Sequence, residues 1–135
     1  MSKPNPRPIR LGRLELRIMN VVWDRGRATV HDVRDTLARG RKPAYSTILT
    51  MMRKLEAKGY LGHDVDGRTF VYRPALTRRR ARRSLLLDLL DRLFDGSPEL
   101  LVSSLIEEKR ITAAELREIR KLIRQRARSH DPDAD

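Results

Sequence analysis

The chain has 135 residues, with 30 lysines and arginines against 18 aspartates and glutamates, so its formal net charge at pH 7 is +12. Hydrophobic residues make up 39% of it, enough for a folded core, and the length allows one compact domain or two very small ones. The absence of cysteine excludes disulfides, thiolate metal sites, iron–sulfur clusters and cysteine nucleophiles.

The positive charge is concentrated in the first half of the chain. Residues 1–74 hold 16 basic and 7 acidic side chains, a net charge of +9, whereas residues 75–135 hold 14 and 11, a net charge of +3. A charge that served solubility alone would be spread evenly. The division favours a half that binds nucleic acid joined to a half with another role. Free use of arginine throughout the sequence is the alternative explanation.

The apolar residues are too dispersed for a membrane segment. No apolar run exceeds three residues, whereas a membrane span needs about 20. Residues 1–10 contain three prolines and no apolar stretch, so we expect a flexible basic arm rather than a secretory signal. We therefore expect a cytoplasmic protein that does not insert into a membrane.

Two helices are predicted at the start of the folded region. From Leu14 apolar residues recur at helical spacing as far as Gly26, which is a plausible end for the first helix. Thr29-Val30-His31-Asp32 resembles a capping box with aspartate in place of glutamate, and it predicts the start of a second helix. Gly40 and Pro43 are expected to end that helix.

A third helix, about Tyr45 to Lys58, is the candidate for DNA recognition. Its apolar residues share one face, while the opposite face carries hydroxyls near its start and cations further along. Hydroxyl and methyl groups can contact base edges in the major groove, and cations can reach phosphates or a guanine. An ordinary solvated helix face is the alternative. The candidate DNA-binding residues of this helix are Ser46, Thr47, Thr50, Arg53 and Lys54.

A β-hairpin is predicted next. Two short strand patterns, Leu61–Val65 and Thr69–Arg73, are joined at Asp66-Gly67, a sequence typical of hairpin turns. Three helices followed by a basic hairpin outline a winged helix-turn-helix, which we assign to residues 11–74. Arg68 near the tip is the candidate wing residue for phosphate or minor-groove contact. The predicted fold class is mainly α with a small β-hairpin.

Residues 75–128 predict three short amphipathic helices. The basic cluster Arg78–Arg83 leads into the first, Ser97-Pro98 starts the second, and the capping box Thr112–Glu115 starts the third. Such short helices cannot bury their apolar residues alone, so we expect burial against a second copy. Residues 129–135 are expected to be a frayed tail. The candidate dimerisation residues are Leu86, Leu89, Leu93, Leu101, Leu105, Leu116 and Ile119.

The sequence gives no indication of catalysis. The histidines His31, His63 and His130 lie in different predicted elements and lack metal-ligand spacing. No glycine-rich phosphate loop, nucleophile elbow or pair of inward carboxylates is recognisable. We therefore expect no enzyme activity, no metal and no cofactor.

Four stretches of sequence occur together in a specific combination. They are Leu11-Gly12-Arg13-Leu14-Glu15, Tyr45-Ser46-Thr47-Ile48-Leu49-Thr50, Leu55-Glu56-Ala57-Lys58-Gly59-Tyr60-Leu61 and Gly67-Arg68-Thr69-Phe70-Val71-Tyr72-Arg73-Pro74. In this combination the chain resembles the BlaI/MecI penicillinase-repressor family over about residues 10–125. The resemblance implies a homodimeric repressor with an N-terminal winged helix for DNA and a C-terminal helical half for dimerisation.

The resemblance also implies how DNA is read. Family members bind a dyad of TACA/TGTA type through threonines of the recognition helix, which correspond here to Thr47 and Thr50, with Lys54 as the basic residue one turn on. Some members have lysine at the position of Ser46. The copper-responsive branch holds metal through a cysteine cluster, and the absence of cysteine here excludes that kind of sensing.

In the β-lactam-responsive branch, a membrane sensor protease leads to cleavage in the dimerisation half. The bond that corresponds here is Ser104–Leu105, which departs from the asparagine-containing site of the resistance repressors. Relief of repression by proteolysis is therefore a hypothesis for this chain. Two other functions stay open: a winged-helix regulator gated by a small ligand, in the manner of the MarR family, and a non-specific architectural or RNA-binding protein.

Overall fold

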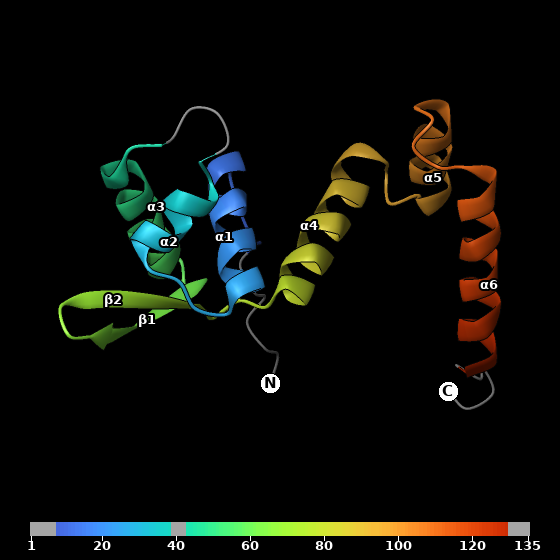
Figure 1. Cartoon of the computed structure of the whole chain (residues 1–135). Coiled ribbons are helices and arrows are strands. Elements are labelled where there is room, and N and C mark those ends of the chain that lie inside the picture. Colours follow the sequence, from blue (N-terminus) through green and yellow to red (C-terminus); the bar gives the residue numbers. More distant parts are fainter. Residues whose placement is uncertain (1–7, 39–42, 130–135) are drawn as a thin grey trace, which may run out of the picture. The chain divides into compact units, whose positions relative to one another are not determined.

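The computed structural model describes residues 8–38 and 43–129 (Figure 1). The chain divides into two units between Asp88 and Leu89, and this division falls within the helix Arg78–Leu93. The predicted class, mainly α with a small hairpin in a winged helix-turn-helix, is confirmed. The elements are α1 (Arg13–Arg25), α2 (Val30–Thr36), α3 (Tyr45–Ala57), β1 (Leu61–Asp66), β2 (Thr69–Pro74), α4 (Arg78–Leu93), α5 (Pro98–Glu107) and α6 (Ala113–Ser129).

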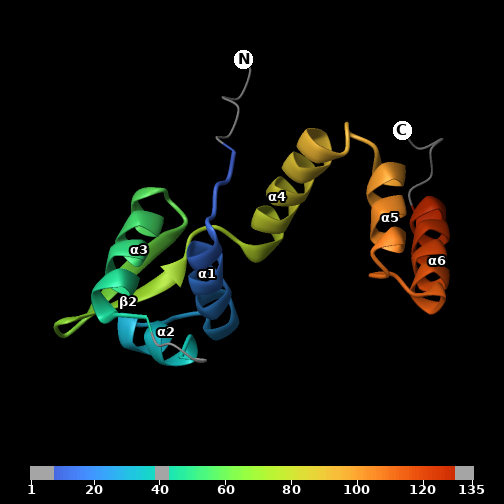
Figure 2. The ribbon, with the colours of Figure 1, turned by 90° about the horizontal axis from the view of Figure 1, so that it is seen from above.

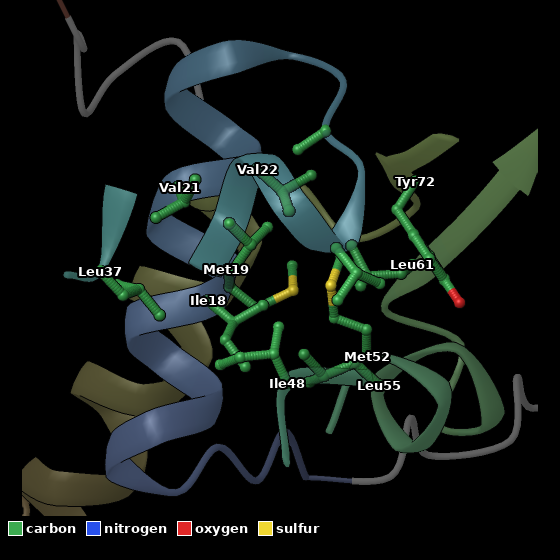
Figure 3. Close-up of a cluster of buried hydrophobic side chains, with 13 residues drawn as sticks. Ile18, Met19, Val21, Val22, Leu37, Ile48, Met52, Leu55, Leu61 and Tyr72 are labelled. Carbon is green, nitrogen blue, oxygen red and sulfur yellow. The ribbon is translucent and has the colours of Figure 1, made fainter. Parts of the chain in front are cut away.

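One hydrophobic core joins α1, α2, α3 and the hairpin (Figure 3). Ile18 and Val22 of α1, Val33 of α2, and Ile48 and Met52 of α3 are completely buried. Helices this short are marginal by themselves, whereas each fully buried aliphatic side chain contributes roughly 1.5–3 kcal/mol. Packing of the apolar faces, rather than helix propensity, therefore holds the three helices together.

A capping box starts α2 where the sequence predicts it. The Asp32 N–H donates to Thr29 Oγ1 (3.1 Å), and the Thr29 N–H donates to Asp32 Oδ2 (2.9 Å). The hydrogen bond from the Thr29 backbone lowers the pKa of Asp32 despite the opposing effect of burial. The ionised carboxylate thereby lies at the positive end of the helix dipole.

The end of α2 differs from the prediction. The helix ends at Thr36, ahead of Pro43 and of Gly40, which lies outside the described residues, so the prediction that those two residues end it is wrong. The Ala38 N–H donates to the Asp35 carbonyl three residues earlier (3.3 Å), a hydrogen bond of the 3₁₀ type that closes the last turn. The side chain of Leu37 is then buried in the core.

The hairpin turn lies one residue later than predicted. β1 and β2 pair antiparallel out to Asp66 and Thr69, so the two-residue turn is Gly67–Arg68. Gly67 has the positive φ (63°) that such a turn requires. The turn lies at the edge of the unit, beyond the helices, in two perpendicular views (Figures 1 and 2).

The other end of the hairpin is fixed to the helices. The backbones of Ala28 and Tyr72 exchange two hydrogen bonds (2.8 and 2.9 Å), which join β2 to the segment between α1 and α2. Tyr72 is completely buried. Phe70, two residues nearer the turn, stacks on the ring of His63 with 4.0 Å between ring centroids. The wing is therefore rigid at its root and exposed at its tip.

The helices of the second unit start at the predicted caps but lack a core. Ser97 Oγ accepts from the Leu100 N–H (3.1 Å) at the start of α5. Thr112 and Glu115 form a reciprocal capping box at the start of α6 (3.0 and 3.1 Å). In the part of the chain that the structure describes, neither α5 nor α6 has a buried residue.

A partly buried ion pair joins the start of α1 to the end of α3. Lys58 Nζ lies 2.8 Å from Glu15 Oε2 and also donates to the Arg10 carbonyl (3.0 Å), while the Gly12 N–H donates to Glu15 Oε1 (2.9 Å). Burial by itself raises the pKa of Glu15, but the hydrogen bonds from Lys58 and Gly12 and the charges of Lys58 and Lys54 outweigh it, and the pKa is lowered.

We expect Glu15→Gln to lower the free energy of unfolding of the first unit by about 1–3 kcal/mol at pH 7, because Lys58 loses its charged acceptor. The folded pKa of Glu15 lies below the ordinary value of 4.5. The stabilisation is therefore fully present above pH 4.5 and is lost as the pH falls through the folded pKa.

Urea unfolding at pH 7 and in acid, followed by the fluorescence of Trp23, the only tryptophan, measures this difference. Asp66→Asn, which changes an exposed carboxyl of the same unit, is the control and should change stability by less than about 0.5 kcal/mol. A loss for Glu15→Gln that stays equally large in acid would contradict the role given to the ion pair.

Candidate nucleic-acid interface

The recognition candidate α3 has one buried face and one exposed face. Ile48, Met52 and Leu55 are completely buried against α1 and α2. The five residues predicted to bind DNA are all exposed and, at 100° per residue, share an arc of about 120°. The structure therefore places these five residues together on the outward face of α3. They are Ser46, Thr47, Thr50, Arg53 and Lys54.

The first turn of α3 is open to a hydrogen-bond acceptor. Within the described chain no side chain caps this turn, whose N-cap residue is Ala44. Its first N–H groups point along the helix axis at the positive end of the dipole, an arrangement that suits phosphate. Arg34 of α2 donates to the Pro43 carbonyl (3.0 Å) and so fixes the chain just before the helix. The rings of His31 and Tyr45 lie 4.8 Å apart and join the first turns of α2 and α3.

The outward face of α3 is positive because its acidic residue is held elsewhere. Glu56, the one acidic residue of the helix, contacts His63 of β1 at 2.7 Å. Lys54 is exposed on the opposite side of the helix from Glu56, and Arg53 is exposed between the two. The helix therefore presents hydroxyl groups over its first half and two cations over its second half, a combination that can reach both base edges and phosphates.

The wing presents one cation at its turn. Arg68 is exposed and occupies the second position of the turn. Nearer the root, Asp64 lies 3.3 Å from Arg27 and 3.4 Å from Arg73, so these two arginines are paired within the protein. Arg68 is thus well placed to contact a phosphate beyond the helices.

The predicted dimerisation residues lie on three helices. Leu86, Leu89 and Leu93 of α4 are exposed, and Leu93 has 68% of its surface in contact with solvent. Leu101 and Leu105 of α5 and Leu116 of α6 are half-buried, and Ile119 of α6 is exposed. The structure thus leaves a large apolar area without cover in the described chain. The further exposed apolar residues of α5 and α6 are Leu100, Ile106, Leu122 and Ile123.

The predicted cleavage bond Ser104–Leu105 lies inside α5. The Ser104 hydroxyl donates to the Leu100 carbonyl (3.0 Å). The carbonyls of Ser104 and Leu105 accept from the N–H groups of Glu108 (3.0 Å) and Arg110 (2.9 Å). A protease binds an extended strand, so the end of α5 has to open before this bond can be cut.

Over residues 8–38 and 43–129, the structure has no group of three histidine, cysteine, aspartate or glutamate side chains that could hold a metal ion. In the same residues no helix is long and apolar enough to span a membrane. His130, one of the histidines considered from sequence, lies outside the described residues.

Sequence reasoning missed the polar contacts that hold α3 in place. Lys58 and Glu15 are 43 residues apart, and His63 and Glu56 are joined only by the fold. One indication was present in the sequence. Glu15 precedes Ile18 and Met19 by three and four residues, so it lies on the apolar face of α1, where a carboxylate needs a partner.

Comparisons with known proteins identify related sequences. The family described as "Penicillinase repressor" matches residues 11–125. The penicillinase repressor of Bacillus licheniformis is 26% identical over 111 residues, which are 82% of this chain and 87% of that protein. The transcriptional regulator BlaI of Mycobacterium tuberculosis (strain H37Rv) is 29% identical over 123 residues, 90% and 88% of the two chains.

A solved structure is also similar in sequence. The solution structure of the DNA binding domain of the repressor BlaI is 30% identical, with a TM-score of 0.47, and the match covers 58% of this chain and 93% of that one. The family match is the decisive comparison, since it spans the winged helix and most of the second unit. The chain therefore belongs to the penicillinase repressor family and is a DNA-binding transcriptional repressor.

Proposed function

We propose that this repressor binds a dyad operator in double-stranded DNA as a homodimer, with α3 of each copy in the major groove. The observation that carries the proposal is the division of α3 into a completely buried apolar face and an exposed face of hydroxyls and cations. Access to an operator supports a cytoplasmic location. We assign the protein no enzymatic role, in keeping with its family of repressors.

Recognition of bases is assigned to the first half of α3. The helix of 13 residues is about 20 Å long, and the major groove, about 12 Å wide, accepts such a helix. Thr47 and Thr50 can place methyl groups against thymine and hydroxyls against groove acceptors. Ser46, at the open first turn, can reach a base or a phosphate. All three side chains are exposed, which supports a role in binding.

Phosphate contacts are assigned to the cations around α3. Arg53 and Lys54 follow the threonines by about one turn, and Arg68 extends the positive surface along the wing. Contacts of this kind position the protein on the duplex and make binding depend on salt, but they carry no sequence information. In this proposal the threonines therefore recognise bases, and the cations contact phosphates.

Dimerisation is assigned to residues 75–128, with residues 11–74 as the winged helix. The predicted arm (residues 1–10) and tail (residues 129–135) lie mostly outside the described residues. The support is the apolar surface of α4, α5 and α6, where Leu122 and Ile123 are 54% and 62% exposed. Exposed apolar patches of this kind mark interaction surfaces. A second copy offers a matching surface under two-fold symmetry, and a dyad operator with half-sites about one helical turn apart fits that symmetry.

Relief of repression is assigned to proteolysis in the second unit, with a membrane sensor protease system as the partner that starts it. A cut at Ser104–Leu105 separates α6 from the rest of the chain. Loss of the dimer removes the high effective concentration of the second winged helix, which is worth on the order of 10²–10⁴ in affinity. An immunoblot during induction tests this step, since full-length protein that persists while transcription rises would rule it out.

We expect Thr47→Ala and Thr50→Ala each to cost about 1–3 kcal/mol of binding to the operator and little on random DNA, because base contacts are lost while phosphate contacts remain. Fluorescence anisotropy on both DNAs measures the difference. Thr47→Ser, which keeps the hydroxyl, separates the methyl contact from the hydrogen bond. Equal losses on operator and random DNA would favour the non-specific architectural protein instead.

Arg68→Ala should weaken binding to operator and random DNA alike and reduce the slope of log K against log salt by about one unit, because one phosphate contact is lost. Titrations at four salt concentrations give the slope. Arg117→Ala, which removes the same charge from α6 in the second unit, is the matched control and should leave the slope unchanged. An unchanged slope for Arg68→Ala would exclude a phosphate contact by the wing.

The full chain should be a dimer at micromolar concentration, and Leu93→Gln should shift it toward monomer by removing an apolar contact between copies. Leu93 is mostly exposed in one chain, so its replacement leaves the core intact. Val65→Gln, at a site 61% exposed on the wing, is the matched control and should remain a dimer. Sedimentation equilibrium decides the matter, and a monomeric full-length chain would refute this assignment.

A further inference from the structure

A cavity of about 790 Å³ lies at the C-terminal end of the recognition helix. All the residues that line it precede Asp88, so it belongs to the first unit alone. Its volume is in the range of small-molecule sites, roughly 300–1,000 Å³. The walls are formed by Lys58 and Tyr60, which follow α3, by Leu76, and by Arg80, Arg83 and Leu87 of α4.

The charged wall of the cavity is entirely cationic. Arg80 and Arg83 lie three residues apart and therefore on the same side of α4. Among the described residues that line the cavity, none carries a carboxylate. The first turn of α4 also lacks an acidic residue, so cations gather at the positive end of a helix dipole. This arrangement favours the binding of an anion.

The neighbouring Arg78, in contrast, makes contacts within the protein. Its guanidinium lies 2.6 Å from Asp24 and 5.4 Å from the ring centre of Trp23. Arg80 and Arg83 have no such carboxylate partner in the described part of the chain. Their charge is therefore available to a ligand.

The other wall of the cavity is apolar. Leu76 is held in place because its carbonyl accepts a hydrogen bond from the indole of Trp23 (2.8 Å). Leu87 of α4 also lines the cavity and is 43% exposed. Leu76 is 6% exposed, so of these two leucines Leu87 supplies most of the apolar surface that a ligand would remove from water, at about 25 cal/mol per Å². The DNA backbone could satisfy the arginines, but it has no group that matches the leucines.

We propose that this cavity binds a small anionic amphiphile, a carboxylate or phosphate attached to an apolar body. The anionic group lies between Arg80 and Arg83, where paired charge-assisted hydrogen bonds are available, and the apolar body lies against Leu76 and Leu87. Such a site supplies the pocket that a ligand-gated regulator needs. The proposal does not depend on operator recognition, and its test uses no DNA in the binding step.

The test is a titration of the full-length protein with octanoate, octyl phosphate, octanol and acetate, by calorimetry and by Trp23 fluorescence. Trp23 reports on the site because its indole N–H donates a hydrogen bond to the carbonyl of Leu76, which lines the cavity. We expect one molecule of octanoate or octyl phosphate per chain, at least about tenfold weaker binding of acetate, and no saturation by octanol. The octyl compound that binds with the higher affinity shows whether the site prefers a carboxylate or a phosphate.

A pair of double substitutions locates the site. Arg80→Gln with Arg83→Gln should weaken octanoate binding by about tenfold or more. Arg79→Gln with Arg82→Gln removes the same charge from the same helix outside the lining and should keep the affinity within about twofold. All four changed residues lie outside the core, and thermal unfolding checks that both variants are folded.

Three results would overturn the proposal: equal weakening by both double substitutions, saturation by octanol, or acetate binding as tight as octanoate binding. A fourth would do the same. If the Arg80 and Arg83 changes weaken binding to random DNA but leave octanoate binding unchanged, these arginines contact the DNA backbone instead.

Discussion

The burial of one face of α3 is the constraint on which the interface depends. Ile48, Met52 and Leu55 are completely buried and recur at helical spacing, so the helix fits against α1 and α2 in only one rotation about its axis. Another rotation would expose this apolar stripe and bury hydroxyls without partners, at a cost of several kcal/mol. The outward direction of Thr47 and Thr50 therefore results from packing on the other side of the helix.

Polar contacts at the end of α3 complete this arrangement. Glu56 is held by His63 at 2.7 Å, and Lys58 is held by Glu15 at 2.8 Å. The first contact pairs the one carboxylate of the helix with His63 of the hairpin. The second joins the end of α3 to α1, so the helix cannot tilt without breaking this partly buried ion pair. Charge on the outward face and rigidity of the helix thus come from the same set of contacts.

The features that the sequence predicted are those decided within a few residues. The capping boxes at Thr29 and Thr112 and the hairpin turn at Gly67 depend on local hydrogen bonds and backbone angles, and the buried face of α3 follows from periodicity. The end of α2 and the pairing of Glu15 with Lys58 depend on tertiary packing between distant residues. Local patterns cannot report such contacts, because they exist only after the chain has folded.

The two units differ in whether they bury their own apolar residues. The first unit has a closed core, so its interface is formed before any partner arrives. The second unit leaves leucines and isoleucines exposed on its helices. If those residues pack against a second copy, two winged helices are linked in one dimer. The affinity for a dyad operator then depends on this link and not only on the interface of each winged helix. A change in the second unit can then weaken operator binding by orders of magnitude while every base contact of α3 stays intact.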